Sequence, residues 1–259
     1  SFDSYNGEAF YNDKMQKVVD ELKEKSLLVK DQGAMIVDLG EDLPPALIQK
    51  SDGSTLYITR DLAALFYRKY TYDFNEVLYV VGNEQKLHFE QLRQVVKKMG
   101  YGFYEDIHHI NFGLVLQDGK KMSTRKGKIV KLETVLKEAT DIALAYINEK
   151  NPELPQKEEI AEKIGVSAII FNDLKNYRTN DVEFNLEDMV NFAGQTGPYL
   201  QYTSVRITSV LEGQSFTSEN LDYELLTNDH SFELVKTIAQ YQEILLKAKS
   251  EYSPSVLAK

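Results

Sequence analysis

Cysteine is absent from the 259 residues of this sequence. Its absence excludes disulfide bonds, a thiolate nucleophile and a zinc site built from cysteines. The four histidines have no metal-ligand spacing such as H-E-x-x-H, so we expect no metal held by protein side chains. These histidines are His88, His108, His109 and His230.

Long apolar runs are also missing, since none approaches the roughly 20 residues that cross a bilayer. The opening residues, SFDSYNGEAF, contain neither the basic nor the apolar part of a signal peptide, and they lack an initiator methionine. We therefore expect a cytoplasmic protein with no membrane partner. We interpret the sequence as an internal piece of a longer protein.

Two common groups of catalytic motifs are absent, but one basic segment stands out. No serine lies in G-x-S-x-G, and neither G-x-x-x-x-G-K-[ST] nor G-x-G-x-x-G occurs. Residues 120–131 contain six lysines or arginines and no carboxylate, although the whole chain has a formal net charge of -10. Such a cluster favours a nucleic acid backbone or a nucleotide phosphate as partner, unless the loop is simply solvated.

The hydrophobic pattern changes along the chain from mixed to purely helical. Apolar segments near residues 34–39, 77–82 and 107–117 predict strands, with helical stripes between them. The second of these, five apolar residues closed by Gly82, is typical of a strand buried on both faces of a parallel sheet. The helical stripe that follows, at residues 92–99, is expected to face inward, with Gly100 as the C-terminal cap of its helix. Residues 149–159 hold two prolines and many charges and predict a boundary, beyond which we expect helices only. The pattern predicts an α/β domain followed by an all-α helical domain.

The basic segment resembles the KMSKS loop of class I aminoacyl-tRNA synthetases, and residues 122–127 match the M-S-T-R-x-G variant of arginyl-tRNA synthetases. The resemblance implies that Lys121, Ser123 and Arg125 face the ATP phosphates and stabilise the charge that develops as pyrophosphate leaves, with Met122 beside the nucleotide. Thr124 stands where the signature has its second lysine. The missing charge must come from Lys121, Arg125, Lys126 or a lysine elsewhere. Lys126 and Lys128 would lie nearer the tRNA acceptor end.

A second segment, SDGSTLYITRD at residues 51–61, resembles the arginyl family's S-D-G-x-x-x-Y-x-T-R-D. The resemblance implies that Tyr57 and Asp61 contact the guanidinium of substrate arginine. Such a role is chemically reasonable, because a carboxylate and a tyrosine ring can hold a planar guanidinium by charge-assisted hydrogen bonds and stacking. The alternative is that Asp61 is an acidic residue in the first turn of a helix, balancing its dipole, and that Tyr57 packs in the core.

A third segment, VVGNEQKLHFEQL at residues 80–92, is similar to the family's V-G-x-x-Q-x-x-H-x-x-Q-L. The resemblance implies that Gln85 completes the arginine pocket and that His88 lies beside ATP. Gly82 ends a strand, so these residues are expected at the carboxyl edge of the sheet, where open α/β domains bind ligands. The alternative for His88 is a capping or surface histidine in the first turn of a helix.

A fourth segment, residues 184–211, resembles the start of the arginyl family's helical anticodon-binding domain. Tyr199, Tyr202 and Arg206 would then stack on or contact unpaired tRNA bases. Their spacing of three and four residues is equally typical of a helix that packs in a core.

Together the four ordered segments imply ATP-dependent attachment of arginine to tRNA(Arg) through an arginyl-adenylate, by a monomer, with Mg2+ accompanying ATP. The catalytic half would be Rossmann-like and the C-terminal domain a helical bundle that binds the anticodon. We expect these ranges: 1–50, a connective region; 51–150, the C-terminal half of the catalytic domain; 151–185, a helical linker; 186–259, a truncated anticodon-binding domain.

The other class I signature, H-x-G-H, does not occur in the sequence. We therefore expect the 259 residues to be inactive alone. Three alternatives remain: another class I enzyme such as a cysteinyl-tRNA synthetase, although its zinc-binding cysteines are missing; a non-catalytic tRNA-binding paralogue; and a helical interaction scaffold with an incidental basic loop.

Overall fold

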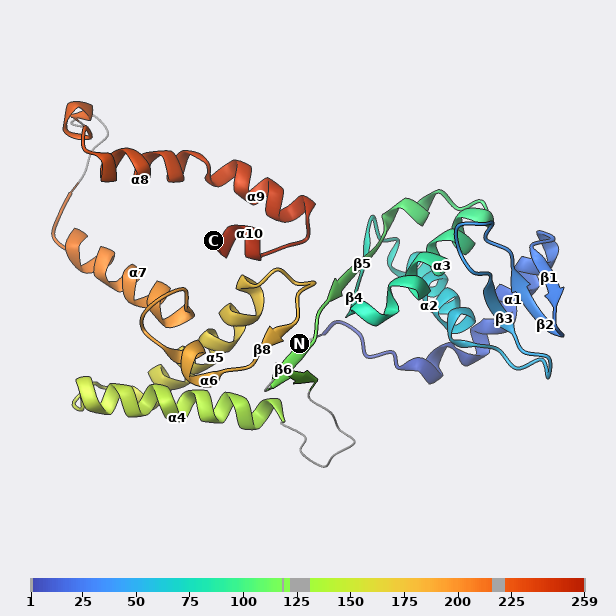
Figure 1. Ribbon diagram of the computed structural model, residues 1–259, viewed down its shortest axis with the longest axis horizontal. Coiled ribbons are helices and arrows are strands. Elements are labelled where there is room, and N and C mark those ends of the chain that lie inside the picture. Colours follow the sequence, from blue (N-terminus) through green and yellow to red (C-terminus); the bar gives the residue numbers. More distant parts are fainter. Residues whose placement is uncertain (1, 118, 122–130, 216–221, 259) are drawn as a thin grey trace. The chain divides into compact units, whose positions relative to one another are not determined.

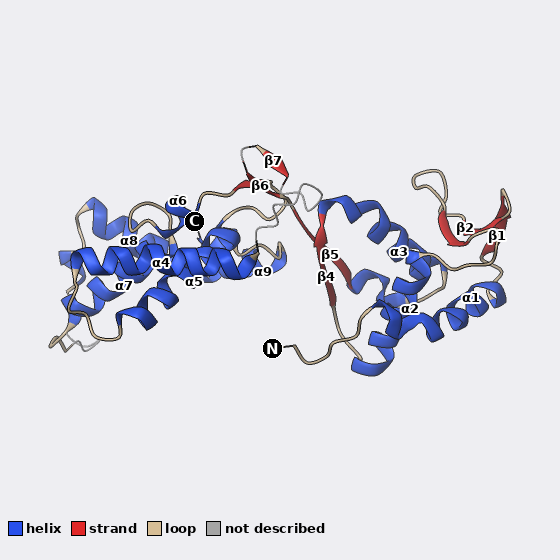
Figure 2. Cartoon of the chain, turned by 90° about the horizontal axis from the view of Figure 1, so that it is seen from below, coloured by secondary structure: helices blue, strands red, loops and turns tan. Residues whose placement is uncertain are grey.

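The computed structural model describes residues 2–117, 119–121, 131–215 and 222–258 (Figure 1). It divides into two compact units, Ser1–Phe112 (unit 1) and Gly113–Lys259 (unit 2). Each unit is described by itself. Unit 1 mixes helices and strands, whereas helices dominate unit 2 (Figure 2).

Unit 1 begins with a short 3-10 helix and an α-helix, continues into a three-stranded antiparallel sheet, and ends in two helices that alternate with two parallel strands. Its elements are η1 (Glu8–Lys14), α1 (Met15–Glu24), β1 (Leu28–Asp31), β2 (Ala34–Val37), β3 (Ala46–Gln49), α2 (Tyr57–Tyr72), β4 (Val77–Gly82), η2 (Asn83–Gln85), α3 (Lys86–Lys98), η3 (Gly102–Asp106) and β5 (Ile107–Phe112). The order confirms the predicted α/β character of this half of the chain.

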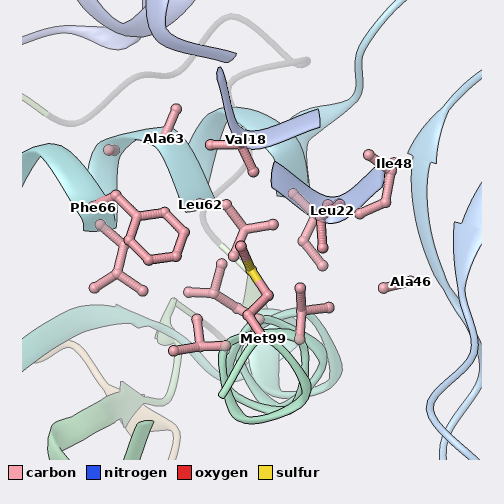
Figure 3. Close-up of a cluster of buried hydrophobic side chains, with 14 of the residues drawn as sticks. Val18, Leu22, Ala46, Ile48, Leu62, Ala63, Phe66 and Met99 are labelled. Carbon is pink, nitrogen blue, oxygen red and sulfur yellow. The ribbon is translucent and has the colours of Figure 1, made fainter. Parts of the chain in front are cut away.

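The core of unit 1 forms where helical stripes from α1, α2 and α3 meet strand β3. Figure 3 shows Leu22, Ile48, Leu62 and Met99 among the side chains that converge there. The apolar stripe predicted for residues 92–99 is buried as expected. Each large aliphatic side chain removed from water in this way contributes roughly 1.5–3 kcal/mol.

The parallel pairing of β4 with β5 confirms one prediction and corrects another. The two strands run side by side from Val77 opposite Ile107 to Gly82 opposite Phe112. The prediction that β4 is buried on both faces is wrong, because burial alternates along it, and Leu78 and Val80 are 46% and 67% exposed. The reason is that, within the described residues, this sheet has two strands and no layer covers its second face.

Unit 2 starts with a small sheet and continues as a series of helices. Its elements are β6 (Val115–Gln117), β7 (Lys120–Lys121), α4 (Leu132–Lys150), α5 (Lys157–Lys175), β8 (Val182–Glu183), α6 (Leu186–Val190), α7 (Gly197–Leu211), η6 (Tyr223–Leu225), α8 (Asp229–Ala239), α9 (Tyr241–Ser250) and α10 (Ser255–Ala258).

Two details of unit 2 differ from the sequence-based expectation. Helices α4 and α5 pack on each other, so residues 149–159 connect two helices of one unit and do not separate compact units. Strand β8 pairs in parallel with β6, which in turn pairs with β7, whereas only helices were expected after residue 159. A two-residue strand leaves too short a pattern to be read from sequence.

Small residues allow α4 and α5 to approach closely. Ala139 and Ala143 of α4 face Ala161, Gly165 and Ala168 of α5, and all five are buried. A Cβ atom on Gly165 would lie only 2.7 Å from the backbone nitrogen of Thr140. Glycine at this position is therefore required by the contact itself.

Among the described residues, no helix combines the length and the apolar character needed to cross a bilayer.

Candidate functional site

The first turns of α2 hold the two residues expected to bind a guanidinium. Tyr57 is the first residue of α2 and Asp61 the fifth, so the two side chains share one helix face. The start of the helix is fixed by the buried Thr59, whose hydroxyl donates a 2.6 Å hydrogen bond to the carbonyl of Ile48 in β3. Backbone and side chain are therefore held by the core at the point where the site begins.

The alternative roles, core packing for Tyr57 and a first-turn acidic residue for Asp61, are both wrong. Tyr57 is 72% exposed and cannot be a core residue. Asp61 lies beyond the first turn of α2, which contains no acidic residue, so it does not balance the dipole of that helix from its first turn. The two side chains instead project from one exposed face, where they are available to a ligand.

A guanidinium already lies beside Tyr57, and it belongs to Arg60. The central carbon of this guanidinium is 5.9 Å from the centroid of the Tyr57 ring. Its Nη1 donates a 2.7 Å hydrogen bond to Oε2 of Glu8 at the start of η1. Glu8 was not among the predicted site residues, because a single acidic residue 49 positions before Tyr57 gives no local signal. The structure thus adds a second carboxylate to the neighbourhood of Tyr57.

The side chain of His88 is hydrogen-bonded to that of Asp61. His88 is the third residue of α3, and its Nε2 lies 2.6 Å from Oδ2 of Asp61. The His88 side chain is 20% exposed and that of Asp61 41% exposed. The alternative of a capping or surface histidine is not what the structure shows, since the ring is largely enclosed and engaged by a residue of another helix. Because α3 follows the end of β4, this bond also brings Asp61 to the carboxyl edge of the strand pair.

The other two predicted residues of this segment lie near but make fewer contacts. Gly82 is the last residue of β4, and Gln85 is the last residue of η2. The Gln85 side chain is exposed and makes no hydrogen bond within the described part of the chain. The structure therefore brings Asp61 and His88 together and leaves Gln85 pointing to solvent.

A buried layer of rings lies behind the site. Burial raises the pKa of Tyr79 to about 12, opposed by its hydrogen-bonded neighbour Arg68, while the negative charge of Asp61 acts in the same direction as burial. Arg68 donates to the Tyr79 hydroxyl at 3.2 Å. The ring of Phe89 contacts both Tyr79 and His109, with centroids 4.7 and 4.5 Å away. Tyr79 is therefore a neutral group, held by Arg68 and Phe89, close enough to Asp61 to feel its charge.

The basic loop lies mostly outside the described residues. Lys121 is the last residue of β7 and is exposed, whereas Met122, Ser123 and Arg125 fall outside the described ranges, as does Thr124. The segment leading into the loop is attached to residues that follow α5. Leu114 N donates to Oδ1 of Asp181 at 2.7 Å, and Gly119 N donates to Oε2 of Glu183 at 3.2 Å.

The predicted tRNA contacts lie on one exposed face of α7. Tyr199, Tyr202 and Arg206 line a groove together with apolar residues nearer the end of the helix. The Arg206 guanidinium carbon is 5.7 Å from the Tyr202 ring centroid. The alternative of a buried core stripe is not what the structure shows, because Tyr199 and Tyr202 are 44% and 49% exposed and Arg206 is exposed as well.

Among the described residues, no group of three or more acidic or histidine side chains is placed to hold a metal ion. The two carboxylates near Tyr57 are engaged separately, Asp61 by His88 and Glu8 by Arg60, and neither contact brings several carboxylates together to bind a metal ion.

Two family models match the chain. Residues 2–186 match the family described as "tRNA synthetases class I (R), catalytic domain", and residues 200–259 match "DALR anticodon binding domain". The α/β fold is therefore that of a class I tRNA synthetase catalytic domain, followed by a helical anticodon-binding domain. Within that class, the chain belongs to the arginyl-tRNA synthetase family.

Individual relatives are similar over the whole chain. An arginine–tRNA ligase of Enterococcus faecalis is 56% identical over 259 residues, which are 100% of this chain and 46% of that protein. An arginine–tRNA ligase of Lactobacillus johnsonii is 54% identical over 261 residues, with the same shares. The chain thus spans about half the length of the curated relatives it matches.

Solved structures show the same fold. An arginyl-tRNA synthetase from Plasmodium falciparum superimposes with a TM-score of 0.83 at 30% identity, covering 98% of this chain and 44% of that one. An arginyl-tRNA synthetase from Thermus thermophilus gives a TM-score of 0.83 at 26% identity, covering 95% of this chain and 47% of that one.

Proposed function

We propose that this chain supplies the arginine pocket and part of the ATP site of an enzyme that attaches arginine to tRNA(Arg) through an arginyl-adenylate. The observation that carries the proposal is the exposed face of α2, on which Tyr57 and Asp61 lie together, with Asp61 bonded to His88 at the strand edge. Membership of the arginyl-tRNA synthetase family supports the same reaction. Because the chain spans about half of its relatives, the activity is assigned to the complete protein.

Arginine recognition needs a fixed carboxylate and a flat ring. Asp61 offers Oδ1 to a guanidinium, since among the described residues only Oδ2 accepts a hydrogen bond, from His88. Tyr57 offers its ring face, and the position of Arg60 shows that a guanidinium can lie near that ring with a carboxylate opposite. Gln85, at the end of η2, would complete the pocket. A charged, planar substrate is held in this way by geometry as well as by charge.

ATP binding is assigned to the edge of β4 and to the basic loop. Gly82 ends the strand, and His88 and Met122 are the further residues predicted beside the nucleotide. Lys121, Ser123 and Arg125 would face the phosphates and stabilise the charge of departing pyrophosphate, a reaction that needs no protein nucleophile. Mg2+ would enter with ATP, because this ion is usually bound through substrate phosphates.

Binding of tRNA is assigned to α7. The match of residues 200–259 to an anticodon-binding domain supports this assignment. The exposed rings of Tyr199 and Tyr202 provide stacking surfaces for unpaired bases, and Arg206 adds a cation beside them. The functional ranges 1–50, 51–150, 151–185 and 186–259, and a monomeric state, stay predictions.

One alternative function is compatible with the same four segments. A tRNA-binding paralogue without catalytic activity would show the same four segments. The two functions differ in one measurable property, which is arginine-dependent exchange of pyrophosphate with ATP by the complete protein. The isolated 259 residues are expected to show background exchange under either function.

The test compares Asp61→Asn with the unchanged complete protein. Loss of the charge should reduce kcat/KM for arginine about 100-fold, equivalent to about 2.7 kcal/mol, because a charge-assisted contact with the guanidinium is lost. The KM for ATP should change less than about twofold, since Asp61 is assigned to arginine alone. Pyrophosphate exchange at varied arginine and ATP gives both constants.

Asp42→Asn is a suitable control, because Asp42 is an exposed carboxylate elsewhere in unit 1. An Asp61→Asn protein with unchanged arginine kinetics would refute the pocket assignment. A complete protein that lacks exchange but binds tRNA(Arg) would support the paralogue.

A further inference from the structure

The bond between His88 and Asp61 has a function that the predicted role of His88 beside ATP does not explain. The two residues lie 27 positions apart, on different helices, and their side chains meet at 2.6 Å. We propose that His88 is a positioning residue that fixes the Asp61 carboxylate for guanidinium recognition, and that its primary role is in binding arginine and not ATP. This inference rests on the proposed function, because it concerns the same pocket.

The Asp61 carboxylate is partly exposed and needs a partner to hold one orientation. The terminal torsion of an aspartate side chain is broad, so an exposed carboxylate does not hold one orientation by itself. A bidentate contact with a guanidinium requires both carboxylate oxygens to lie in a defined plane. The Nε2–H of His88 restrains Oδ2, and each carboxylate oxygen keeps a lone pair for a guanidinium N–H, because an oxygen can accept two hydrogen bonds.

The His88 ring is itself held in place by the core of unit 1. His88 lies in the first turn of α3, directly before Phe89, and the two rings meet edge to face with centroids 5.3 Å apart. Phe89 is buried and packs on Tyr79 and His109, which belong to the two parallel strands. The donor therefore comes from the core of unit 1, whereas Asp61 is the more exposed partner.

Two polar groups, Tyr79 and Arg68, lie near the pair of Asp61 and His88. Tyr79 remains neutral, because burial raises its pKa to about 12, and the nearby Arg68 is hydrogen-bonded to the Tyr79 hydroxyl. Neither group replaces His88 as a donor to Asp61, since the carboxylate accepts from His88 alone among the described residues. Removal of the histidine would leave Asp61 in place but without a fixed orientation.

The test uses the complete protein, measures arginine-dependent pyrophosphate exchange, and compares three variants of His88. His88→Leu removes the donor, and it should raise KM for arginine about 10- to 100-fold, the range for a hydrogen bond to a charged group, while KM for ATP changes less than about twofold. His88→Gln places an amide nitrogen near the position of Nε2 and should restore KM for arginine to within about threefold. His88→Asn is too short to reach Asp61 and should behave as His88→Leu does.

A double-mutant cycle with Asp61→Asn separates positioning from an independent role. If His88 acts through Asp61, adding His88→Leu to Asp61→Asn should have little further effect, because the orientation of a missing carboxylate no longer matters. His230→Gln, in α8 of unit 2, is the control for a histidine change far from the pocket in sequence and in another unit. Melting temperatures identify any variant that fails to fold. If His88→Leu does not fold, the comparison of His88→Gln with His88→Asn still shows whether a donor to Asp61 is needed.

Three outcomes have distinct meanings. A rise in KM for ATP with unchanged KM for arginine would overturn the inference and return His88 to the nucleotide. The inference would also be overturned if the increases in KM for arginine caused by His88→Leu and by Asp61→Asn multiplied in the double variant. A complete protein with no arginine-dependent exchange would contradict the proposed function, and in that case direct titration of arginine against the unchanged protein and His88→Leu decides the inference by itself.

Discussion

Helix α3 of unit 1 and helix α8 of unit 2 are both amphipathic, but they bury their apolar faces to different degrees. In α3 the residues Phe89, Leu92, Val95 and Val96 are all buried. In α8 no residue is buried, and Phe232, Leu234 and Ile238 are each more than 60% exposed. The apolar face of a helix can thus be located from its period of 3.6 residues, but whether another element covers that face depends on the rest of the fold.

The two candidate sites also differ in how far the residues around them are buried. The pair of Asp61 and His88 rests on a closed core, so its geometry is fixed by many contacts behind it. The groove on α7 is lined by residues of that helix alone. The first site is therefore suited to recognising a small rigid ligand, and the second offers a surface to a large one.

The largest effect expected from this comparison is loss of a core side chain in unit 1. Leu92→Ala should lower the free energy of unfolding of unit 1 by about 2–5 kcal/mol, because Leu92 is fully buried and the cavity would be lined by side chains from several elements. Urea unfolding followed by circular dichroism measures the change.

Leu87→Ala is the matched control, since Leu87 lies on the same helix but is half exposed. Its cost should stay below about 1 kcal/mol. Equal costs for the two variants would show that the described core does not stabilise α3.

A smaller effect is expected where α4 and α5 meet in unit 2. Gly165→Val should destabilise the pair by about 1–3 kcal/mol, because the added atoms would overlap the α4 backbone at Ala139 and Thr140. Glu162→Val introduces the same side chain at an exposed position of α5 and serves as control. Hydrogen exchange of the α5 amides reports the change locally, and equal protection in both variants would argue against the close approach.

These contrasts show which parts of the fold were predictable. The stripe of α3 and its termination before Gly100 were read correctly, because both depend on local features: apolar period, and a glycine at a φ of +87° after the helix. The exposed second face of β4 and the existence of strand β8 were not predicted correctly, because they depend on pairing between elements that are distant in sequence. Local pattern fixes the type of an element, and tertiary context fixes its environment.

The candidate site was predictable to a similar extent. Tyr57 and Asp61 were located from the resemblance of residues 51–61 to a family segment, and the structure places them on one exposed helix face. The bond from Asp61 to His88 and the approach of Glu8 to Arg60 could not be foreseen, since each joins residues distant in sequence. The arrangement of Ser123 and Arg125 lies outside the described residues and stays a prediction.

The smallest effect is expected in α9 and gives the sharpest test of the comparison. Leu246 is 68% exposed, so Leu246→Ala in the 259-residue chain should change the free energy of unfolding by less than about 0.5 kcal/mol. The same substitution in the complete protein distinguishes two origins of the exposed face. A cost above about 2 kcal/mol there would mean that residues outside this chain cover α9 and complete a core like that of unit 1. An equally small cost in both proteins would mean that the apolar surface of α9 is exposed in the complete protein as well, and that its contrast with the buried face of α3 belongs to the fold itself.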